Sequence, residues 1–359
     1  MKENTCVGLI APFPPPLGGM AIQATKLVEN LRMEGFDVIE IPTNLPLPGC
    51  LKPIEKMKFV RTLIRSPYLL YQIYRHCPRV DVFYFLTGFF HFFFWVTLPV
   101  LLLLKAKRNR VILSARGGDA GRFFKRWKPI VKCVLKIPQI VTVPSGFLQK
   151  EFSDLLQIRA LIVPNIVDLH LFPFRERSFI QPQFITARHL EEIYNIACTI
   201  RAFKKISQAY PQSRLTIVGD GSQRESLQRL IHSLGLNGNV RLAGRVPHDQ
   251  LPALYDLHDI FINSSNVDNL PGAILESFAS GLPVVSTRAG GIPYLVQDQK
   301  TGLLVELEDC EALAEAAISL IVSPKTAQRI AQNAFEYVRE YSWNNVRKIL
   351  LPLLQQSCR

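Results

Sequence analysis

The sequence predicts an α/β protein made of two doubly wound parallel-sheet domains of similar size. Twelve short apolar runs recur along its 359 residues, and amphipathic segments of helical length lie between many of them. This alternation of strand and helix is typical of parallel sheets that are covered by helices on both faces. At roughly 150 residues per domain, the length also favours two domains.

Six expected strands fall in each half of the chain. In the first half they lie at 6–11, 36–41, 81–86, 110–114, 139–143 and 160–163. In the second half they lie at 184–186, 214–218, 239–242, 259–263, 283–287 and 302–305. Residues 164–183 are rich in Pro and Phe and weakly periodic, so they predict a linker.

The chain is expected to end in two helices that begin at Pro324. The second, over 343–354, is amphipathic and is expected to pack back on the first domain. We therefore predict a Rossmann-like N-terminal domain over 1–168, a Rossmann-like C-terminal domain over 169–335, and a returning helix over 336–359. Ligands of open α/β sheets bind at the carboxyl ends of the strands, so a ligand is expected in a cleft between the two domains.

Composition excludes several classes of protein. The seven cysteines are scattered and form no C-x-x-C pair, which argues against a disulfide framework or a zinc knuckle. The same scatter of cysteines favours a reducing compartment. The first residues lack the pattern of a secretory signal. Residues 82–104 contain no Asp, Glu, Lys or Arg and are long enough to span a bilayer. Because Gly88 and Pro99 divide this run, we expect a buried strand and then a core or interfacial helix from His91 to Leu104.

The positive charge is concentrated in the first half of the chain. Residues 1–168 hold 23 Lys/Arg and 11 Asp/Glu, out of 42 and 29 in the whole chain. Between Lys105 and Lys136 there are eleven Lys/Arg and one acid, directly after the apolar segment 89–104. Such a cluster attracts anionic lipid headgroups, although a solvated helix face would have the same composition. No nucleic-acid recognition module is evident, so no nucleic-acid partner is expected.

The residues from Asp268 to Gly281 predict a short buried helix of about ten residues. Asn269 is a good N-cap, Pro271 suits the first turn, and Gly281 suits the exit. The helix is apolar except at Glu276, and a charge on a buried helix needs a partner. Two interpretations stay open: a structural carboxylate held by backbone amides, or a carboxylate that holds ligand hydroxyls. The positive N-terminus of the helix also suits a phosphate.

An ordered set of motifs extends this region into a family signature. Asp268 is followed, after seven intervening residues, by Glu276 in the segment LESFASGLPVV. This pattern resembles the donor-site signature of the retaining family 4 glycosyltransferases, which have the GT-B fold. The segments VPNIVD, IVGDG, LAGRV, GGIP and TGLL follow in the family's order, and the agreement is best over roughly 160–322. The resemblance implies two Rossmann-like domains that face a deep interdomain cleft.

The resemblance also implies roles for individual residues. Glu276 is expected to bind the ribose of a nucleotide-sugar, and Asp268 to lie beside the hydroxyls of the donor sugar. Arg188 is expected to pair with the diphosphate and neutralise the charge of the leaving group. Four residues, Asn269, Leu270, Pro271 and Gly272, would face the sugar and the diphosphate. Three others, Gly219, Gly221 and Arg245, would lie near the nucleotide.

The sequence departs from the family's pattern at three places. Asp268 stands where the family usually has Glu, which is one methylene longer. The family's usual Lys is replaced by the segment Ile193-Tyr194-Asn195, so Arg188 becomes the main cation of that loop. The catalytic-site His that is often found near 114–119 is absent, and His189 is expected to be a solvated loop residue.

In the first domain, Gly18 and Gly19 follow the first strand, where glycines let the backbone approach a phosphate. A simple tight turn would have the same glycines. Arg116 and Asp119 could handle an acceptor or form a structural pair, and the sequence leaves both open.

The resemblance predicts a retaining enzyme that transfers a hexose from a UDP- or GDP-sugar to a lipid-linked or polysaccharide acceptor, without a metal or another cofactor. The leaving phosphate itself would take the acceptor's proton, so no enzyme nucleophile is needed. We expect a bacterial protein of the cytoplasm with peripheral contact to the inner face of the membrane, active in cell-surface polysaccharide or glycolipid synthesis. Two alternatives are a nucleotide-sugar 2-epimerase and a non-catalytic nucleotide-sugar-binding protein.

Overall fold

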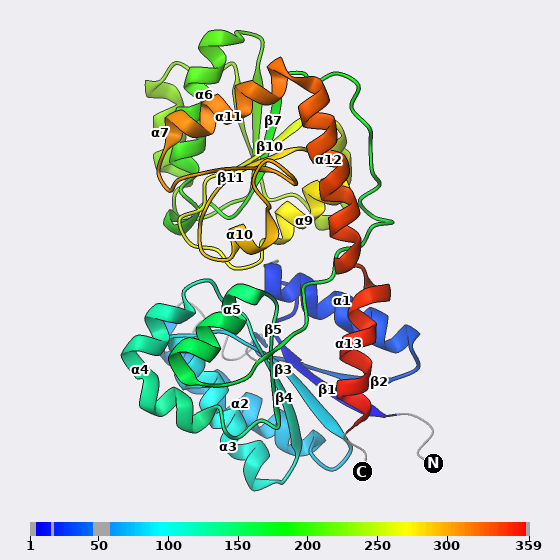
Figure 1. Ribbon diagram of the computed structural model, residues 1–359. Coiled ribbons are helices and arrows are strands. Elements are labelled where there is room, and N and C mark those ends of the chain that lie inside the picture. Colours follow the sequence, from blue (N-terminus) through cyan, green and yellow to red (C-terminus); the bar gives the residue numbers. More distant parts are fainter. Residues whose placement is uncertain (1–4, 16–17, 46–57, 357–359) are drawn as a thin grey trace. The chain divides into compact units, whose positions relative to one another are not determined.

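The computed structural model describes residues 5–15, 18–45 and 58–356, and the chain divides into two compact units (Figure 1). Unit 1 comprises residues 1–166 and 346–359, and unit 2 comprises residues 167–345. The division after Ile166 falls two residues before the boundary that the sequence predicts. The return to unit 1 begins at Val346, so ten residues of the predicted returning segment, 336–345, belong to unit 2.

Unit 1 contains a six-stranded parallel sheet with the order β2-β1-β3-β4-β5-β6. Its strands are β1 (Cys6–Ala11), β2 (Asp37–Pro42), β3 (Val82–Thr87), β4 (Arg110–Ala115), β5 (Ile140–Val143) and β6 (Leu161–Ile162). All six predicted strands are confirmed, with ends shifted by one residue at most. Central strands β1 and β3 are buried along their whole length, as expected for a parallel sheet with helices on both faces.

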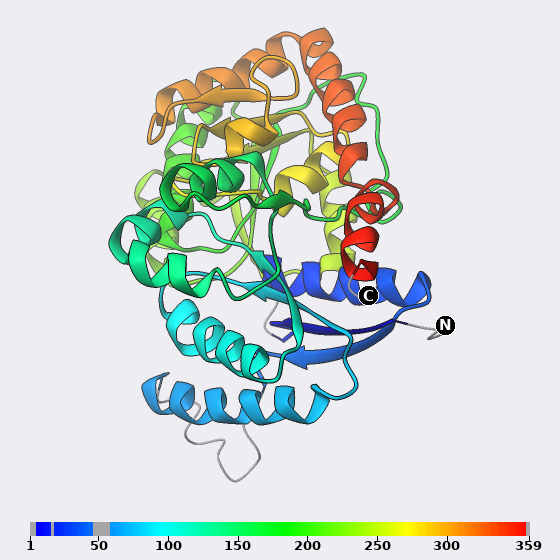
Figure 2. The same ribbon diagram turned by 60° about the horizontal axis from the view of Figure 1, so that its bottom comes forward.

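Helices cover both faces of the first sheet. They are α1 (Gly19–Met33), α2 (Lys58–His76), α3 (Leu98–Ala106), α4 (Ala120–Val134) and α5 (Gly146–Glu151), with π-helical turns at η2 (Phe93–Thr97) and η3 (Phe152–Leu156). The helices α2 to α5 share one apolar core with the strands, and α1 lies on the other face, above the strands in Figure 2.

The apolar segment 82–104 divides as the sequence predicts. Residues Val82–Thr87 form the buried strand β3, and helical residues begin at His91. Phe93, Val100 and Leu104 of the helical part are buried in the unit 1 core. None of the helices that the structure describes combines the length and the hydropathy needed to span a bilayer.

Unit 2 contains a second six-stranded parallel sheet, with the order β12-β11-β10-β7-β8-β9. Its strands are β7 (Gln183–Ala187), β8 (Arg214–Val218), β9 (Val240–Gly244), β10 (Ile260–Asn263), β11 (Val284–Thr287) and β12 (Leu303–Val305). All six predicted strands are again confirmed, within two residues at each end.

Two layers of helices enclose the second sheet. They are α6 (Ile196–Ala209), α7 (Arg224–Ser233), α8 (Leu251–Asp256), α9 (Gly272–Ala279), α10 (Ile292–Leu295), α11 (Cys310–Val322) and α12 (Pro324–Val338), with short 3-10 turns at η4 (Glu192–Tyr194), η5 (His248–Gln250) and η6 (Arg339–Tyr341). One core joins α6, α7 and α11 to the sheet, and the other joins α8, α9, α10 and the end of α12 to it.

This arrangement creates a switch point in unit 2. From β7 the chain builds β8 and β9 outward on one side, and it then returns to form β10 against the other side of β7. The segments that leave the carboxyl ends of β7 and β10 therefore diverge from neighbouring strands. Ligands of open α/β sheets bind at such a point.

The predicted C-terminal helices are confirmed as α12 and α13 (Trp343–Gln355). From Val346 onward α13 belongs to unit 1, where Arg347 pairs with Glu34 at the end of α1 and Leu353 accepts a hydrogen bond from Arg110. Its residues Val346, Leu350 and Leu354 are buried, one turn apart on one face.

Candidate active site

Unit 2 brings together charged side chains at its switch point. Arg188 directly follows β7, and the loop that carries Asp268 follows β10. The side chains of both residues are about nine-tenths buried, and they form an ion pair with each other. Arg188 is therefore not an ordinary solvated charge, because the neighbouring strands hold it against a carboxylate inside the unit.

The Arg188 guanidinium has a well-defined environment. Its Nη2 lies 3.4 Å from Ser265 Oγ, and its central carbon lies 4.7 Å from the centre of the Tyr194 ring. Burial lowers the pKa of Arg188, and the nearby Glu276 carboxylate acts in the opposite direction. The buried Nε has no hydrogen-bond partner among the described residues. A cation with an unused donor at a switch point can bind an anion.

Glu276 lies in α9 and is only 7% exposed. Its Oε1 is 2.7 Å from His248 Nε2, and its Oε2 is 3.4 Å from the Tyr255 hydroxyl. Burial, together with the negative charge of Glu276, raises the pKa of Tyr255 well above its usual value. The Tyr255 phenol therefore stays protonated and donates a hydrogen bond to Glu276. Within the described residues the hydrogen-bond partners of this carboxylate are side chains. They are not the backbone amides that a purely structural carboxylate was expected to use.

The start of the predicted helix is wrong. Asn269 does not cap it, because α9 begins at Gly272 with Pro271 in the cap position, and the helix has eight residues. A residue that precedes proline is driven out of the helical region, so Leu270 cannot form a first turn. The loop is also held from outside, since the Gly291 amide donates to the Asp268 carbonyl oxygen at 3.0 Å.

The helix exit is as predicted. Gly281 has a φ of +70°, and its amide donates to the carbonyl oxygen of Phe278. The next amide, of Leu282, donates to the carbonyl oxygen of Ser277. This pair of bonds ends the helix and satisfies carbonyl groups that would otherwise be left open.

Gly219 and Gly221 lie where the β8 loop approaches the Arg188 loop most closely. Gly219 has a φ of +136°, and a Cβ on it would lie 1.9 Å from the Arg188 carbonyl oxygen. A Cβ on Gly221 would lie 2.5 Å from the Leu190 carbonyl oxygen. These glycines allow the two backbones to meet. Arg245, which follows β9, is an exposed residue whose Nε lies 3.6 Å from Asp220.

The predicted residues of unit 1 have different surroundings. Gly18 caps α1 and Gly19 begins it, and a Cβ on either would meet open space. Arg116 is buried, which lowers the pKa of its guanidinium, and it donates to Ser114 Oγ and to Asn165 Oδ1 at 2.6 Å. Asp119 lies 3.8 Å from Arg122. Arg116 and Asp119 thus contact other partners instead of forming the structural pair that the sequence left open.

Comparison with known proteins places the unit 2 residues in a family. Residues 175–337 match the family model described as "Glycosyl transferases group 1". This segment of unit 2 therefore belongs to the glycosyl transferases group 1 family. The segment contains Arg188, Asp268 and Glu276, together with the residues that surround them.

Two curated relatives match this chain in part. The lipopolysaccharide core biosynthesis glycosyltransferase LpsE of Rhizobium meliloti is 36% identical over 145 residues, which is 40% of this chain and 42% of that protein. The GDP-mannose-dependent alpha-(1-6)-phosphatidylinositol monomannoside mannosyltransferase of Mycolicibacterium smegmatis is 28% identical over 251 residues, 63% of this chain and 64% of that protein. The matches therefore span less than two thirds of either relative.

A solved structure matches the fold along nearly the whole chain. The sucrose-phosphate synthase of Thermosynechococcus elongatus superposes with a TM-score of 0.81 over 98% of this chain and 99% of that chain, at 17% sequence identity. The chain has the GT-B fold that its motifs predict, with two parallel six-stranded sheets.

Three residues of the matched segment have roles that the sequence did not reveal. His248 contacts Glu276, and Tyr194 contacts Arg188. Neither His248 nor Tyr194 belongs to a local sequence pattern that indicates its contact. Arg177 lies in the linker, is 5% exposed, and donates to the Gly281 carbonyl oxygen at 2.9 Å.

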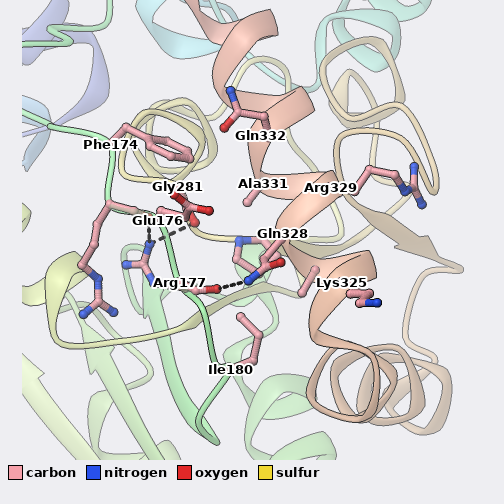
Figure 3. A pocket seen from close by; sticks show the side chains of 13 residues that line it. Phe174, Glu176, Arg177, Ile180, Gly281, Lys325, Gln328, Arg329, Ala331 and Gln332 are labelled. Carbon is pink, nitrogen blue, oxygen red and sulfur yellow. Dashed lines mark hydrogen bonds between the residues drawn. The ribbon is translucent and has the colours of Figure 1, made fainter.

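Figure 3 shows Arg177 beside a cavity of about 260 Å³, with the Gln328 side chain donating to its main-chain oxygen. None of the predicted site residues lines this cavity.

Proposed function

We propose that this protein transfers a hexose from a UDP- or GDP-sugar to a lipid-linked or polysaccharide acceptor, with retention of anomeric configuration. The observation that carries the proposal is the buried Arg188, Asp268 and Glu276 cluster at the switch point of the matched segment. The names of the relatives support it, since one acts in lipopolysaccharide core synthesis and another uses GDP-mannose on a phosphatidylinositol mannoside.

In this proposal Glu276 binds the ribose hydroxyls and Arg188 binds the diphosphate. Asp268 lies beside the hexose, and the residues at the start of α9, Asn269, Leu270, Pro271 and Gly272, face the sugar and the diphosphate. The Arg188 cation stabilises the charge that grows on the leaving group, which is our reason for proposing transfer without a metal or cofactor. The nucleotide lies near Gly219, Gly221 and Arg245.

The proposed reaction exchanges one bond for another on the same face of the sugar. The bond between the sugar C1 and the diphosphate oxygen breaks, and a bond from C1 to the acceptor oxygen forms. The acceptor's proton moves to the leaving phosphate oxygen, so no covalent enzyme intermediate arises. The acceptor binds to unit 1, where we propose contacts from Arg116 and Asp119. We assign the Gly18–Gly19 turn to a phosphate of the donor.

The test begins with thermal unfolding of the full chain in the presence of UDP-, GDP- and ADP-sugars. At 100 times the dissociation constant, binding stabilises the fold by about 2.7 kcal/mol. We expect one nucleotide series to raise the melting temperature of the wild type. The effect should vanish in Glu276→Gln and persist in Glu225→Gln, a control on the exposed side of α7.

Turnover then separates transfer from its alternatives. Incubation of the stabilising donor with lipid-linked saccharide acceptors should yield a product whose new bond keeps the donor's anomeric configuration. Conversion of the donor without an acceptor would indicate an epimerase, and binding without turnover would indicate a non-catalytic protein. If no nucleotide-sugar raises the melting temperature, the proposal is rejected.

We also propose that unit 1 contacts an anionic membrane surface through α4. This helix buries Phe123, Phe124 and Val131, while its opposite side exposes basic residues. The exposed basic residues of this helix and of the turn after it are Arg122, Lys125, Arg126, Lys128 and Lys136. Trp127 lies beside Arg126, and Ile130 is exposed among the lysines. Basic and apolar groups on one face suit anionic headgroups and the acyl boundary below them.

Vesicle co-sedimentation tests this contact. Each basic residue near an anionic surface contributes about 1 kcal/mol, so the triple variant Lys125→Glu/Arg126→Glu/Lys128→Glu should bind phosphatidylglycerol vesicles at least roughly 100-fold more weakly. A control that reverses Arg201, Arg241 and Lys300 in unit 2 changes the net charge equally and should bind like the wild type. Equal losses in the two variants would reject a specific contact by α4.

A further inference from the structure

We infer that His248 is a positioning residue: with Tyr255 it fixes the Glu276 carboxylate so that one lone pair on each oxygen points outward for a vicinal diol. The inference rests on the proposed function, because the diol in question is the ribose of the nucleotide. It adds a residue outside the family motif to the site, and it states which ligand group that residue controls.

Each oxygen of the Glu276 carboxylate contacts one of the two donor side chains. His248 Nε2 lies 2.7 Å from Oε1, and the Tyr255 hydroxyl lies 3.4 Å from Oε2. Because a carboxylate accepts and does not donate, Nε2 must carry a hydrogen, which it does in the imidazolium and in one neutral tautomer. The contact at Oε1 is therefore a donated hydrogen bond to an anion, which is shorter and stronger than a bond between neutral groups.

His248 is itself held in place. Its side chain is only 16% exposed, and its ring meets Phe172 edge to face, with the centroids 5.4 Å apart. Phe172 is fully buried and lies 5.8 Å from the Tyr255 ring. The same aromatic residue thus supports both donors, and the Glu276 carboxylate is fixed between side chains that cannot easily change rotamer.

This geometry limits what Glu276 can bind. An ionised carboxylate has about four lone-pair sites, two on each oxygen. His248 and Tyr255 occupy one site on each oxygen, so one site on each oxygen stays available. Two parallel acceptor sites match two hydroxyl groups on adjacent carbons. Without His248, Oε1 could rotate and the match to a diol would be lost.

The experiment compares ribose with dideoxyribose. Calorimetric titration measures the dissociation constants of UDP and GDP and of their 2′,3′-dideoxy forms for the wild type, His248→Leu and His248→Gln. We expect the wild type to bind the ribose form at least roughly 10-fold more tightly than the dideoxy form. In His248→Leu this ratio should fall to about 1–3, while the dideoxy form keeps its affinity within about twofold.

Conservative variants keep the result interpretable. His248→Gln retains a side-chain donor and should restore part of the ratio. Tyr255→Phe removes only a hydroxyl and should lower the ratio by itself, which provides a second reading if His248→Leu is too unstable to purify. The exposed His232→Leu is the matched control and should keep the wild-type ratio.

The outcomes separate the inference from the proposed function. If the wild type binds neither diphosphate, both are rejected. If it binds one with a preference for ribose, and His248→Leu and Tyr255→Phe weaken ribose and dideoxy forms by the same factor, His248 has only a structural role and the inference alone is rejected.

Discussion

Replacement of Arg177 by methionine should destabilise unit 2 strongly. The guanidinium is buried, and burial beside Arg175 lowers its pKa to about 10, so it is charged at neutral pH. Methionine keeps the apolar stem and removes the charge. The lost hydrogen bonds are those to Asp259 Oδ1 and to the carbonyl oxygens of Arg175, Tyr255, His258, Ser280 and Gly281, at 2.9 to 3.2 Å.

The magnitude follows from what stays paired. Removing one partner of a buried ion pair costs about 3–5 kcal/mol. Asp259 keeps the Arg175 guanidinium at 2.7 Å and the Gln181 amide at 2.8 Å, so we expect the lower end, about 3 kcal/mol. For a domain of this size, that corresponds to a fall in melting temperature of about 6–12 °C.

The assay is scanning calorimetry of the full chain, with Arg175→Met as the matched control. Arg175 also pairs with Asp259, but its side chain is 42% exposed, and a pair of that kind contributes about 1 kcal/mol or less. Equal shifts for Arg177→Met and Arg175→Met would refute the reasoning, because the expected difference rests on the burial of Arg177 and on the carbonyl hydrogen bonds that it makes there.

Two further variants test the loop packing and the pH dependence of stability. Gly219→Ala should destabilise the fold by about 3 kcal/mol and weaken nucleotide binding, because its Cβ would press on the Arg188 carbonyl oxygen. Gly238→Ala is the control, since a Cβ there meets open space, and it should change neither stability nor binding. Equal effects of the two variants would contradict this prediction. Burial lowers the folded-state pKa of His258, so the free energy of unfolding should fall as the pH drops below about 6.5, the unfolded value, by up to ~1.4 kcal/mol per pH unit. Denaturant titrations at pH 7.5 and 5.5 should show a smaller pH dependence for His258→Gln than for wild type or the exposed His189→Gln, and equal slopes would argue against it.

Much of the fold could be predicted because strands carry local signals. Each of the twelve strands is a short apolar run bounded by polar or turn residues, and all twelve were placed within two residues. The division of 82–104 into a strand and a helix followed from Gly88 and Pro99 in the same way. The start of α9 was missed because the capping preference of Asn269 competed with the effect of Pro271 on the residue before it, and the proline effect prevailed.

The site could be predicted only in part. Arg188, Asp268 and Glu276 were chosen as candidates from motif spacing, and the structure brings the first two into contact with each other. The role of Tyr194 was not foreseen, although its position was noted, because its contact with Arg188 depends on the path of the loop between β7 and α6.

Thus the sequence by itself determined the α/β class, the two sheets, the returning C-terminal helix and the positions of the main charged candidates. Periodicity and turn residues act within a few positions of the chain, so these features can be read locally. Only the tertiary structure decided that His248 holds Glu276 across 28 positions and that Arg177 is buried beneath a loop about 100 positions away. Such contacts arise where the order of the strands brings distant loops to the same edge of the sheet, and no local pattern encodes that order.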